Sequence, residues 1–222
     1  MDCIFVHGMG QGTASWEIVI EEIQKKISLN AICPDLWSLL EGKDYTYNSM
    51  YSTFANYLNN YDSKLPLNLC GASFGGMLVL NYALDFPERV NSIILVGTRY
   101  SVAGNEMKPL HKFFLKILPT PPVIKNMGMT QKEFLSFRAT MEGLDFGEKI
   151  NDISCPALIL CGENDNEVFK SAFKYFVKNI QNVSHDFIKN AGHMVNQDNP
   201  KELAIKVGDF LAKQALTDRE DV

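Results

Sequence analysis

Six short runs rich in β-branched and apolar residues recur along the chain, and longer stretches with helical spacing of apolar residues separate most of them. This alternation constrains the fold, because strands joined by helices form βαβ units in which neighbouring strands run parallel. The predicted strands are Cys3–His7, Ala31–Pro34, Leu67–Cys70, Ser92–Val96, Ala157–Cys161 and Val183–Ile188. We therefore predict an α/β fold, with a mostly parallel sheet of about six strands flanked by helices on both faces.

Two of the predicted helices have a clear apolar stripe. Apolar residues at three- and four-residue spacing place one face of a helix against a core. One stripe precedes the second predicted strand, and the other follows Pro200, a residue suited to the first turn of a helix. The stripes consist of Trp16, Val19, Ile23 and Ile27 in the first helix, and of Leu203, Val207 and Phe210 in the last. We interpret both as faces that pack on the sheet.

The chain of 222 residues is predicted to form one domain with one insertion. The segment from Thr98 to about Gly147 separates two predicted strands by far more than a βαβ connection needs. It carries a helical apolar stretch that includes Phe113 and Phe114, and an amphipathic stretch around Phe134. Open α/β sheets bind ligands beyond the carboxyl ends of their strands. We therefore predict that the insertion forms a short helical lid over that edge.

Charge and composition exclude several classes of partner. The formal net charge is −5, and no run of Lys and Arg forms a local basic patch. Nucleic acid is therefore not expected as a partner. No apolar run approaches the roughly 20 residues that span a bilayer, and the first residues carry no basic leader, so we expect no membrane span and a cytoplasmic location.

No group of His, Cys and Asp has the spacing of metal ligands, and we expect neither metal nor cofactor. The five cysteines, mostly within apolar runs, are interpreted as buried reduced thiols.

The chemical motif with the most specific context is Gly71-Ala72-Ser73-Phe74-Gly75-Gly76. It follows a predicted strand and precedes a predicted helix, which is the setting of a nucleophile elbow. So tight a turn strains the backbone, and a glycine on either side of the serine removes clashes. We predict that Ser73 is a nucleophile at the carboxyl edge of the sheet and that the Phe74 amide faces a developing oxyanion. The alternative is a glycine-rich turn with an idle serine.

A second glycine-rich loop, His7-Gly8-Met9-Gly10-Gln11-Gly12, follows the first predicted strand. It lacks the Gly-Lys-Ser/Thr of a P-loop and the glycine spacing of a dinucleotide-binding loop. Two amides that converge on one oxygen need such a loop beside the elbow, and the Met9 amide is predicted to be the second oxyanion donor. His7 is interpreted as a residue that fixes the loop rather than as a catalytic base.

A serine hydroxyl needs an imidazole to take its proton, and the chain has four histidines. His193 lies in a polar glycine turn between the last predicted strand and the last helix, on the same sheet edge as the elbow. His111 in the insertion and His185 inside a strand are interpreted as structural. The imidazole in turn needs a buried carboxylate. Asp165, in the loop beyond the fifth predicted strand, is preferred over Glu163, which lies closer to the strand end.

Together these motifs resemble those of the α/β-hydrolase superfamily, and within it the small lidded serine hydrolases of carboxylesterase type. The chain order of serine, aspartate and histidine matches that fold. The resemblance spans nearly the whole chain and implies that four motifs supply the oxyanion donor, the nucleophile, the acid and the base. These motifs are His7–Gly10, Gly71–Gly76, Gly162–Asp165 and Ala191–His193.

The chain departs from the superfamily pattern at its start. Members usually begin with an antiparallel hairpin before the strand that carries the His-Gly loop, whereas here that strand starts at residue 2 or 3. We therefore expect a sheet without this hairpin, whose exposed edge would favour a homo-oligomer. The serine at the elbow argues against the dehalogenase and epoxide-hydrolase branches, which resemble this fold but use an aspartate there.

The function predicted from these residues is two-step acyl transfer, in which Ser73 attacks a carbonyl, an acyl-enzyme forms, and water releases the acid. Apolar residues of the insertion favour a small apolar ester-like substrate, and its predicted contacts are Gly8, Phe113, Phe114 and Met194. A thioesterase, an amidase, a carbon–carbon hydrolase or a lyase would use the same three residues. A ligand-binding or signalling protein with slow turnover is the alternative from another class.

Overall fold

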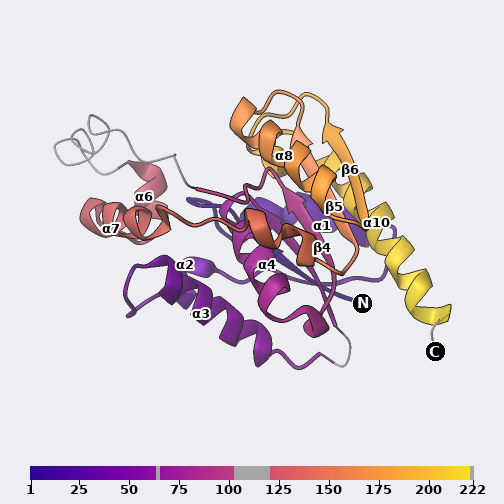
Figure 1. Ribbon diagram of the computed structural model, residues 1–222, viewed down its shortest axis with the longest axis horizontal. Coiled ribbons are helices and arrows are strands. Elements are labelled where there is room, and N and C mark those ends of the chain that lie inside the picture. Colours follow the sequence, from indigo (N-terminus) through magenta and orange to yellow (C-terminus); the bar gives the residue numbers. More distant parts are fainter. Residues whose placement is uncertain (64–65, 103–120, 221–222) are drawn as a thin grey trace.

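The computed structural model describes residues 1–63, 66–102 and 121–220. Figure 1 shows a central sheet with helices on both sides. Within the described residues, six strands form one sheet in the order β2-β1-β3-β4-β5-β6, and every neighbouring pair is parallel. The strands are β1 (Asp2–Val6), β2 (Asn30–Ile32), β3 (Leu67–Ala72), β4 (Val90–Val96), β5 (Ala157–Gly162) and β6 (Val183–Ile188). The predicted α/β fold is confirmed.

Helices connect these strands. The predicted stripe of Leu203, Val207 and Phe210 lies on a helix, whereas the first stripe does so only in part, because Trp16 lies in a 3₁₀ helix and Ile27 lies beyond the α-helix that holds Val19 and Ile23. The α-helices are α1 (Glu17–Gln24), α2 (Leu36–Leu39), α3 (Tyr47–Asn59), α4 (Phe74–Asp85), α6 (Pro122–Asn126), α7 (Gln131–Met141), α8 (Glu167–Asn179), α9 (Val195–Asp198) and α10 (Pro200–Glu220). Short 3₁₀ helices are η1 (Thr13–Trp16), η2 (Pro87–Arg89) and η3 (Gly147–Asp152). In the part of the chain that the structure describes, no helix is both long enough and apolar enough to cross a membrane.

Alternate residues of the strands face two separate cores, one on each side of the sheet. On β1, Ile4 and Val6 belong to the core beneath α3, α4 and α8, whereas Cys3 and Phe5 belong to the core beneath α1 and α10. All four side chains are fully buried. A strand that is buried on both faces has a continuous apolar sequence, which explains why the central strands were visible as apolar runs.

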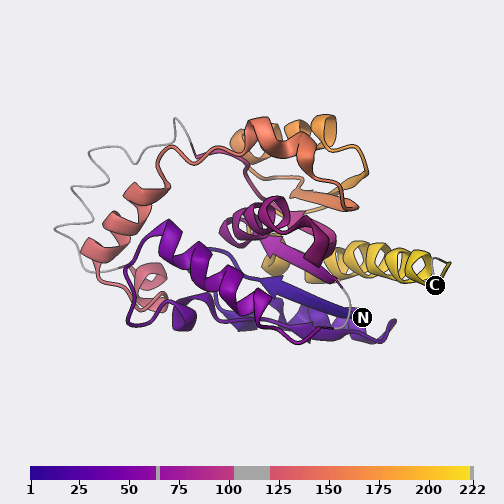
Figure 2. The same cartoon turned by 60° about the horizontal axis from the view of Figure 1, so that its bottom comes forward.

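Between β4 and β5 the chain leaves the sheet. In Figure 2, β1 runs from the N-terminus toward the side of the molecule where α6 and α7 lie. Helix α7 packs against α3, and its fully buried Phe137 contacts the rings of Trp37 and Phe74. The first predicted helical stretch of the insertion, with Phe113 and Phe114, lies outside the described residues.

Candidate active site

Ser73 sits on the turn between β3 and α4. Its backbone has φ 50° and ψ −112°, a conformation that a residue with a Cβ adopts only where its surroundings enforce it. The Ser73 amide donates a hydrogen bond to the Val96 carbonyl of β4 at 2.9 Å, which ties the turn to the sheet. The turn also depends on Gly71, where a Cβ would lie 2.6 Å from the Gly75 carbonyl oxygen.

Three side chains from separate loops meet at this turn. The Ser73 hydroxyl lies 3.0 Å from Nε2 of His193, and Nδ1 of that ring lies 3.1 Å from Oδ2 of Asp165. Asp165 follows β5 and His193 follows β6, so the parallel strands bring all three residues to the same edge of the sheet. With its proton on Nδ1 and donated to Asp165, the ring leaves Nε2 free to accept the serine proton.

The Asp165 carboxylate is held on both of its oxygens. Its side chain is only 1% exposed, and Oδ1 accepts a hydrogen bond from the Asn166 amide at 2.7 Å. The Cys161 thiol lies 3.9 Å from Oδ2. Burial, followed by the Asp165 charge, raises the pKa of Cys161 to about 12, so this thiol stays protonated and can donate. Glu163, the alternative acid, instead accepts a hydrogen bond from the Asn190 amide at 3.3 Å.

An aromatic neighbour covers one face of the His193 ring. Phe169 on α8 stacks on it, with ring centroids 3.9 Å apart and planes 30° apart. The His193 side chain is nevertheless 31% exposed, so the packing restricts the ring without enclosing it. Sequence reasoning missed Phe169, because nothing in α8 marks which of its aromatic residues points to the sheet edge.

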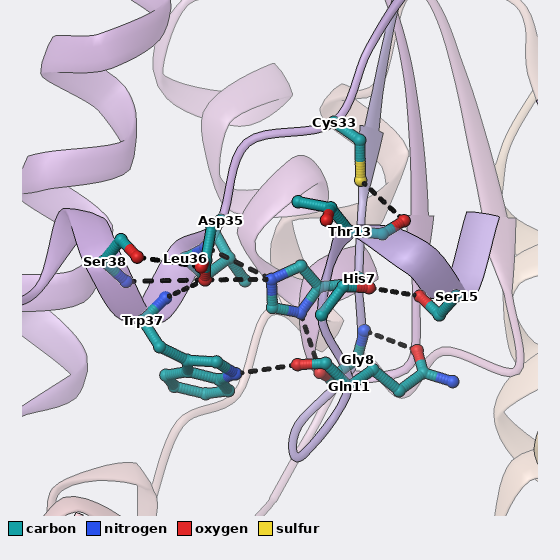
Figure 3. Close-up of polar contacts among 11 residues, drawn as sticks. His7, Gly8, Gln11, Thr13, Ser15, Cys33, Asp35, Leu36, Trp37 and Ser38 are labelled. Carbon is teal, nitrogen blue, oxygen red and sulfur yellow. Dashed lines mark hydrogen bonds and ion pairs between the residues drawn. The ribbon is translucent and has the colours of Figure 1, made fainter. Parts of the chain in front are cut away.

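His7, at the end of β1, is fully buried and holds the glycine-rich loop. Its Nδ1 lies 3.1 Å from the Gly8 carbonyl oxygen, and its Nε2 accepts a hydrogen bond from the Leu36 amide at 3.1 Å (Figure 3). Only a neutral ring with its proton on Nδ1 satisfies both contacts. Burial lowers the pKa of His7 and favours this neutral form. Asp35, 3.9 Å from Nε2, is therefore a neighbour of the ring rather than its ion-pair partner.

Gln11 links the glycine-rich loop to the segment after His193. Its side-chain carbonyl accepts from the Gly8 amide at 2.9 Å, and its side-chain amide donates to Oδ1 of Asn196 at 3.1 Å. The Trp37 indole donates to the Gln11 backbone carbonyl at 2.9 Å, as Figure 3 also shows. Sequence reasoning missed this link, because its two side chains are 185 positions apart and no local pattern pairs them.

Two backbone amides near Ser73 have no hydrogen-bond acceptor among the residues that the structure describes. Phe74 is the first residue of α4, so its amide has no acceptor within the helix. The Met9 amide donates no hydrogen bond to any residue that the structure describes. Gly8 differs, because the Gln11 side chain already occupies its amide. The two amides that we predicted to be oxyanion donors thus belong to residues that line the same pocket as Ser73.

Ser73 opens into a pocket of about 110 Å³. The described residues around the serine are six apolar ones, Met9, Phe74, Met77, Val102, Met141 and Phe169, and two arginines, Arg99 and Arg138. Arg138 and Met141 belong to α7, so the insertion forms one wall of the pocket. Gly8 and Met194, two of the predicted substrate contacts, are not among these lining residues, and Met194 is 38% exposed. Sequence reasoning missed both arginines.

Comparison with known sequences gives a family and distant relatives. A family model described as "Alpha/beta hydrolase family" matches residues 3–206. The monoacylglycerol lipase ABHD6 of Homo sapiens is 23% identical over 194 residues, which cover 70% of this chain and 58% of the lipase. The chain thus spans less than two thirds of the length of that relative.

Solved structures share the architecture. A thermophilic esterase from Thermogutta terrifontis matches with a TM-score of 0.75 and 20% identity, over 96% of this chain and 90% of the esterase. A meta-cleavage product hydrolase from Pseudomonas fluorescens matches with a TM-score of 0.77 and 18% identity, over 96% of this chain and 91% of that hydrolase. At such low identities the likeness concerns the fold alone.

Proposed function

This chain belongs to the alpha/beta hydrolase family, and on that premise we propose that it is a serine hydrolase that cleaves a carboxylic ester or a similar acyl bond. The observation that carries the proposal is the continuous chain of polar contacts from Ser73 through His193 to Asp165. Such a series of contacts activates a hydroxyl that is otherwise a poor nucleophile near neutral pH. The strained turn at Ser73 supports the same role, because strain of this kind concentrates at functional sites.

In the proposed first step, the Ser73 oxygen attacks the substrate carbonyl carbon while Nε2 of His193 takes the hydroxyl proton. The amides of Met9 and Phe74 then stabilise the negative charge that develops on the carbonyl oxygen. Asp165 stabilises the imidazolium. When the tetrahedral intermediate collapses, His193 gives its proton to the leaving alcohol, and the acyl group stays on Ser73.

In the second step, a water molecule attacks the acyl-enzyme with His193 as its base, and the acid is released. The partial exposure of the His193 side chain supports this step, because water can reach the ring. Ser73 regains its proton from His193, which returns the site to its starting state.

We further propose that α6 and α7 act as a lid and that the substrate has an apolar part. Arg138 and Met141 of α7 line the pocket, and Phe137 packs against Phe74 beside the serine. The six apolar lining residues support a small apolar acyl or alcohol group.

Turnover of short-chain 4-nitrophenyl esters tests the proposal. We expect the wild-type protein to release 4-nitrophenolate and Ser73→Ala to lower kcat/KM by about 10⁴-fold or more, because the nucleophile is removed. Ser52→Ala, at an exposed position on α3, is the matched control and should leave turnover unchanged. Saturable binding of these esters without turnover would contradict the proposal and favour a ligand-binding protein.

A further inference from the structure

Two arginines line the pocket around Ser73, in a chain whose formal net charge is −5. Arg99 follows the end of β4, and Arg138 belongs to α7. Both residues are half-buried. The segment just after β4 and helix α7 therefore each contribute one guanidinium group to a pocket whose other walls are mainly apolar.

Holding two like charges in this place is electrostatically unfavourable. Burial, followed by the charge of Arg138, lowers the pKa of Arg99. Burial also lowers the pKa of Arg138. An arginine nevertheless keeps its charge near neutral pH, so both groups stay cationic. A nearby anion would offset the free-energy cost of desolvating two positive charges and of the repulsion between them.

The described residues supply that anion only in part. Glu142, the residue after the end of α7, acts electrostatically on Arg138. Arg99 forms no ion pair with any residue that the structure describes. Its guanidinium carbon instead lies 5.9 Å from the ring centroid of Phe169, which stacks on His193. Phe169 thus neighbours both the charge of Arg99 and the ring of the proposed catalytic base.

We propose that Arg99 and Arg138 bind a carboxylate on the substrate of Ser73, so that the preferred substrate is an ester whose apolar chain carries an anionic group. This inference rests on the proposed function. A guanidinium group is well suited to a carboxylate, because its planar N–H donors match the two oxygens. A bound carboxylate would offset the repulsion between the arginines, and the apolar lining residues would contact the chain between the carboxylate and the ester.

A charge-matched pair of substrates tests the proposal. The mono-4-nitrophenyl ester of adipic acid carries a free carboxylate, and its methyl ester is a neutral analogue of similar length. Both release 4-nitrophenolate, so one assay measures both. We expect kcat/KM of the wild-type protein to be about tenfold or more higher for the free acid, because charge-assisted hydrogen bonds form only with it. The preference should weaken as the salt concentration increases.

Two variants assign the preference to the arginines. Arg99→Met and Arg138→Met remove one charge each and keep an unbranched side chain. Each should lower kcat/KM for the free acid about tenfold and leave that for the methyl ester within about twofold. Lys132→Met removes the same charge from an exposed position on α7 and should change neither value. Turnover of the methyl ester by each variant shows that it has folded.

The outcomes separate this inference from the proposed function. If the wild-type protein hydrolyses neither these two esters nor any other, the hydrolase proposal fails and this inference fails with it. If it hydrolyses the methyl ester as fast as the free acid or faster, the hydrolase proposal stands and the role of the arginines is overturned. An equal loss for both esters in the arginine variants also overturns it, because the arginines would then support only the fold.

Discussion

The pocket at Ser73 has two sides that are built differently. On the strand side, turns after β3, β5 and β6 hold Ser73, Asp165 and His193 at polar contact distances of 3.0 and 3.1 Å. On the α7 side, a helix of the insertion contributes Arg138 and Met141. The sheet determines the geometry of the strand side, whereas the α7 side depends on how one helix packs. We infer that the strand side carries the bond-breaking chemistry and that the α7 side, together with Arg99, selects the substrate.

The largest effect should come from Asp165 on the strand side. Asp165→Asn is expected to lower kcat about 10⁴-fold, because an amide no longer holds the required tautomer of His193 or stabilises its charged form. The free energy of unfolding should change far less. Glu163→Gln is the matched control and should stay within about twofold of wild type in ester assays. A larger loss in Glu163→Gln would mean that the acid is assigned to the wrong residue.

The next largest effect is expected at Gln11, and it tests whether the glycine-rich loop is held rigidly beside the strand side. Gln11→Glu keeps an acceptor for the Gly8 amide but removes the donor to Asn196. We expect kcat to fall about tenfold with little change in KM, because the loop loses the shorter of its two hydrogen bonds to Asn196 and is held less rigidly. Gln24→Glu is the control, because the Gln24 side chain forms its one hydrogen bond within the described residues to the nearby Leu29 carbonyl. An unchanged kcat with lower thermal stability would assign Gln11 to the fold alone.

His7, on the strand side, should make the stability of the folded protein decrease at acidic pH. Burial lowers the pKa of His7 in the folded state below its ordinary value of 6.5. Below pH 6.5 the unfolded chain therefore binds a proton at His7 more readily than the folded chain does. The stability that neutral His7 contributes is present above pH 6.5 and is lost as the pH falls from 6.5 through the lower pKa of the folded state. The loss should be at most about 1.4 kcal/mol per pH unit.

Urea unfolding at several pH values checks this expectation. His7→Gln should be less stable than wild type near neutral pH, but its stability should fall less steeply as the pH is lowered below 6.5. Parallel losses in the two proteins would show that His7 is not the group that titrates.

The smallest effect concerns the α7 side. Thr130 caps α7 by accepting a hydrogen bond from the Glu133 amide at 3.2 Å, and the Glu133 carboxylate accepts one from the Thr130 amide at 2.8 Å. Thr130→Ala should speed hydrogen exchange of α7 amides about fivefold and leave α4 unchanged. Equal acceleration in both helices would mean that the two sides open as one unit.

The strand side could be predicted from the sequence because its residues lie beside turns with local signals. Glycines flank Ser73 at positions 71 and 75, and Gly192 precedes His193. Strand boundaries were less accurate. Strand β2 ends at Ile32 rather than at Pro34, because a proline has no amide to donate to a neighbouring strand.

The residues that α7 contributes to the pocket could not be predicted from the sequence, although a helical stretch around Phe134 was. Arg138 faces the pocket only because α7 packs against α3, and no local pattern specifies that orientation. Arg99 and Phe169 likewise belong to no motif. Residues from distant parts of the chain that meet through tertiary packing need the structure to be recognised. The predicted contacts of Phe113 and Phe114, which lie outside the described residues, stay predictions.

Labelling with a fluorophosphonate probe tests most directly whether Ser73 is an activated nucleophile. The wild-type protein, Ser73→Ala and His193→Ala are treated in parallel, and mass spectrometry of peptides locates the adduct. We predict one adduct on Ser73 in the wild-type protein and none in either variant, because the probe reacts with a serine that an imidazole activates. An unlabelled wild-type protein, or an adduct that persists in Ser73→Ala, would contradict the account.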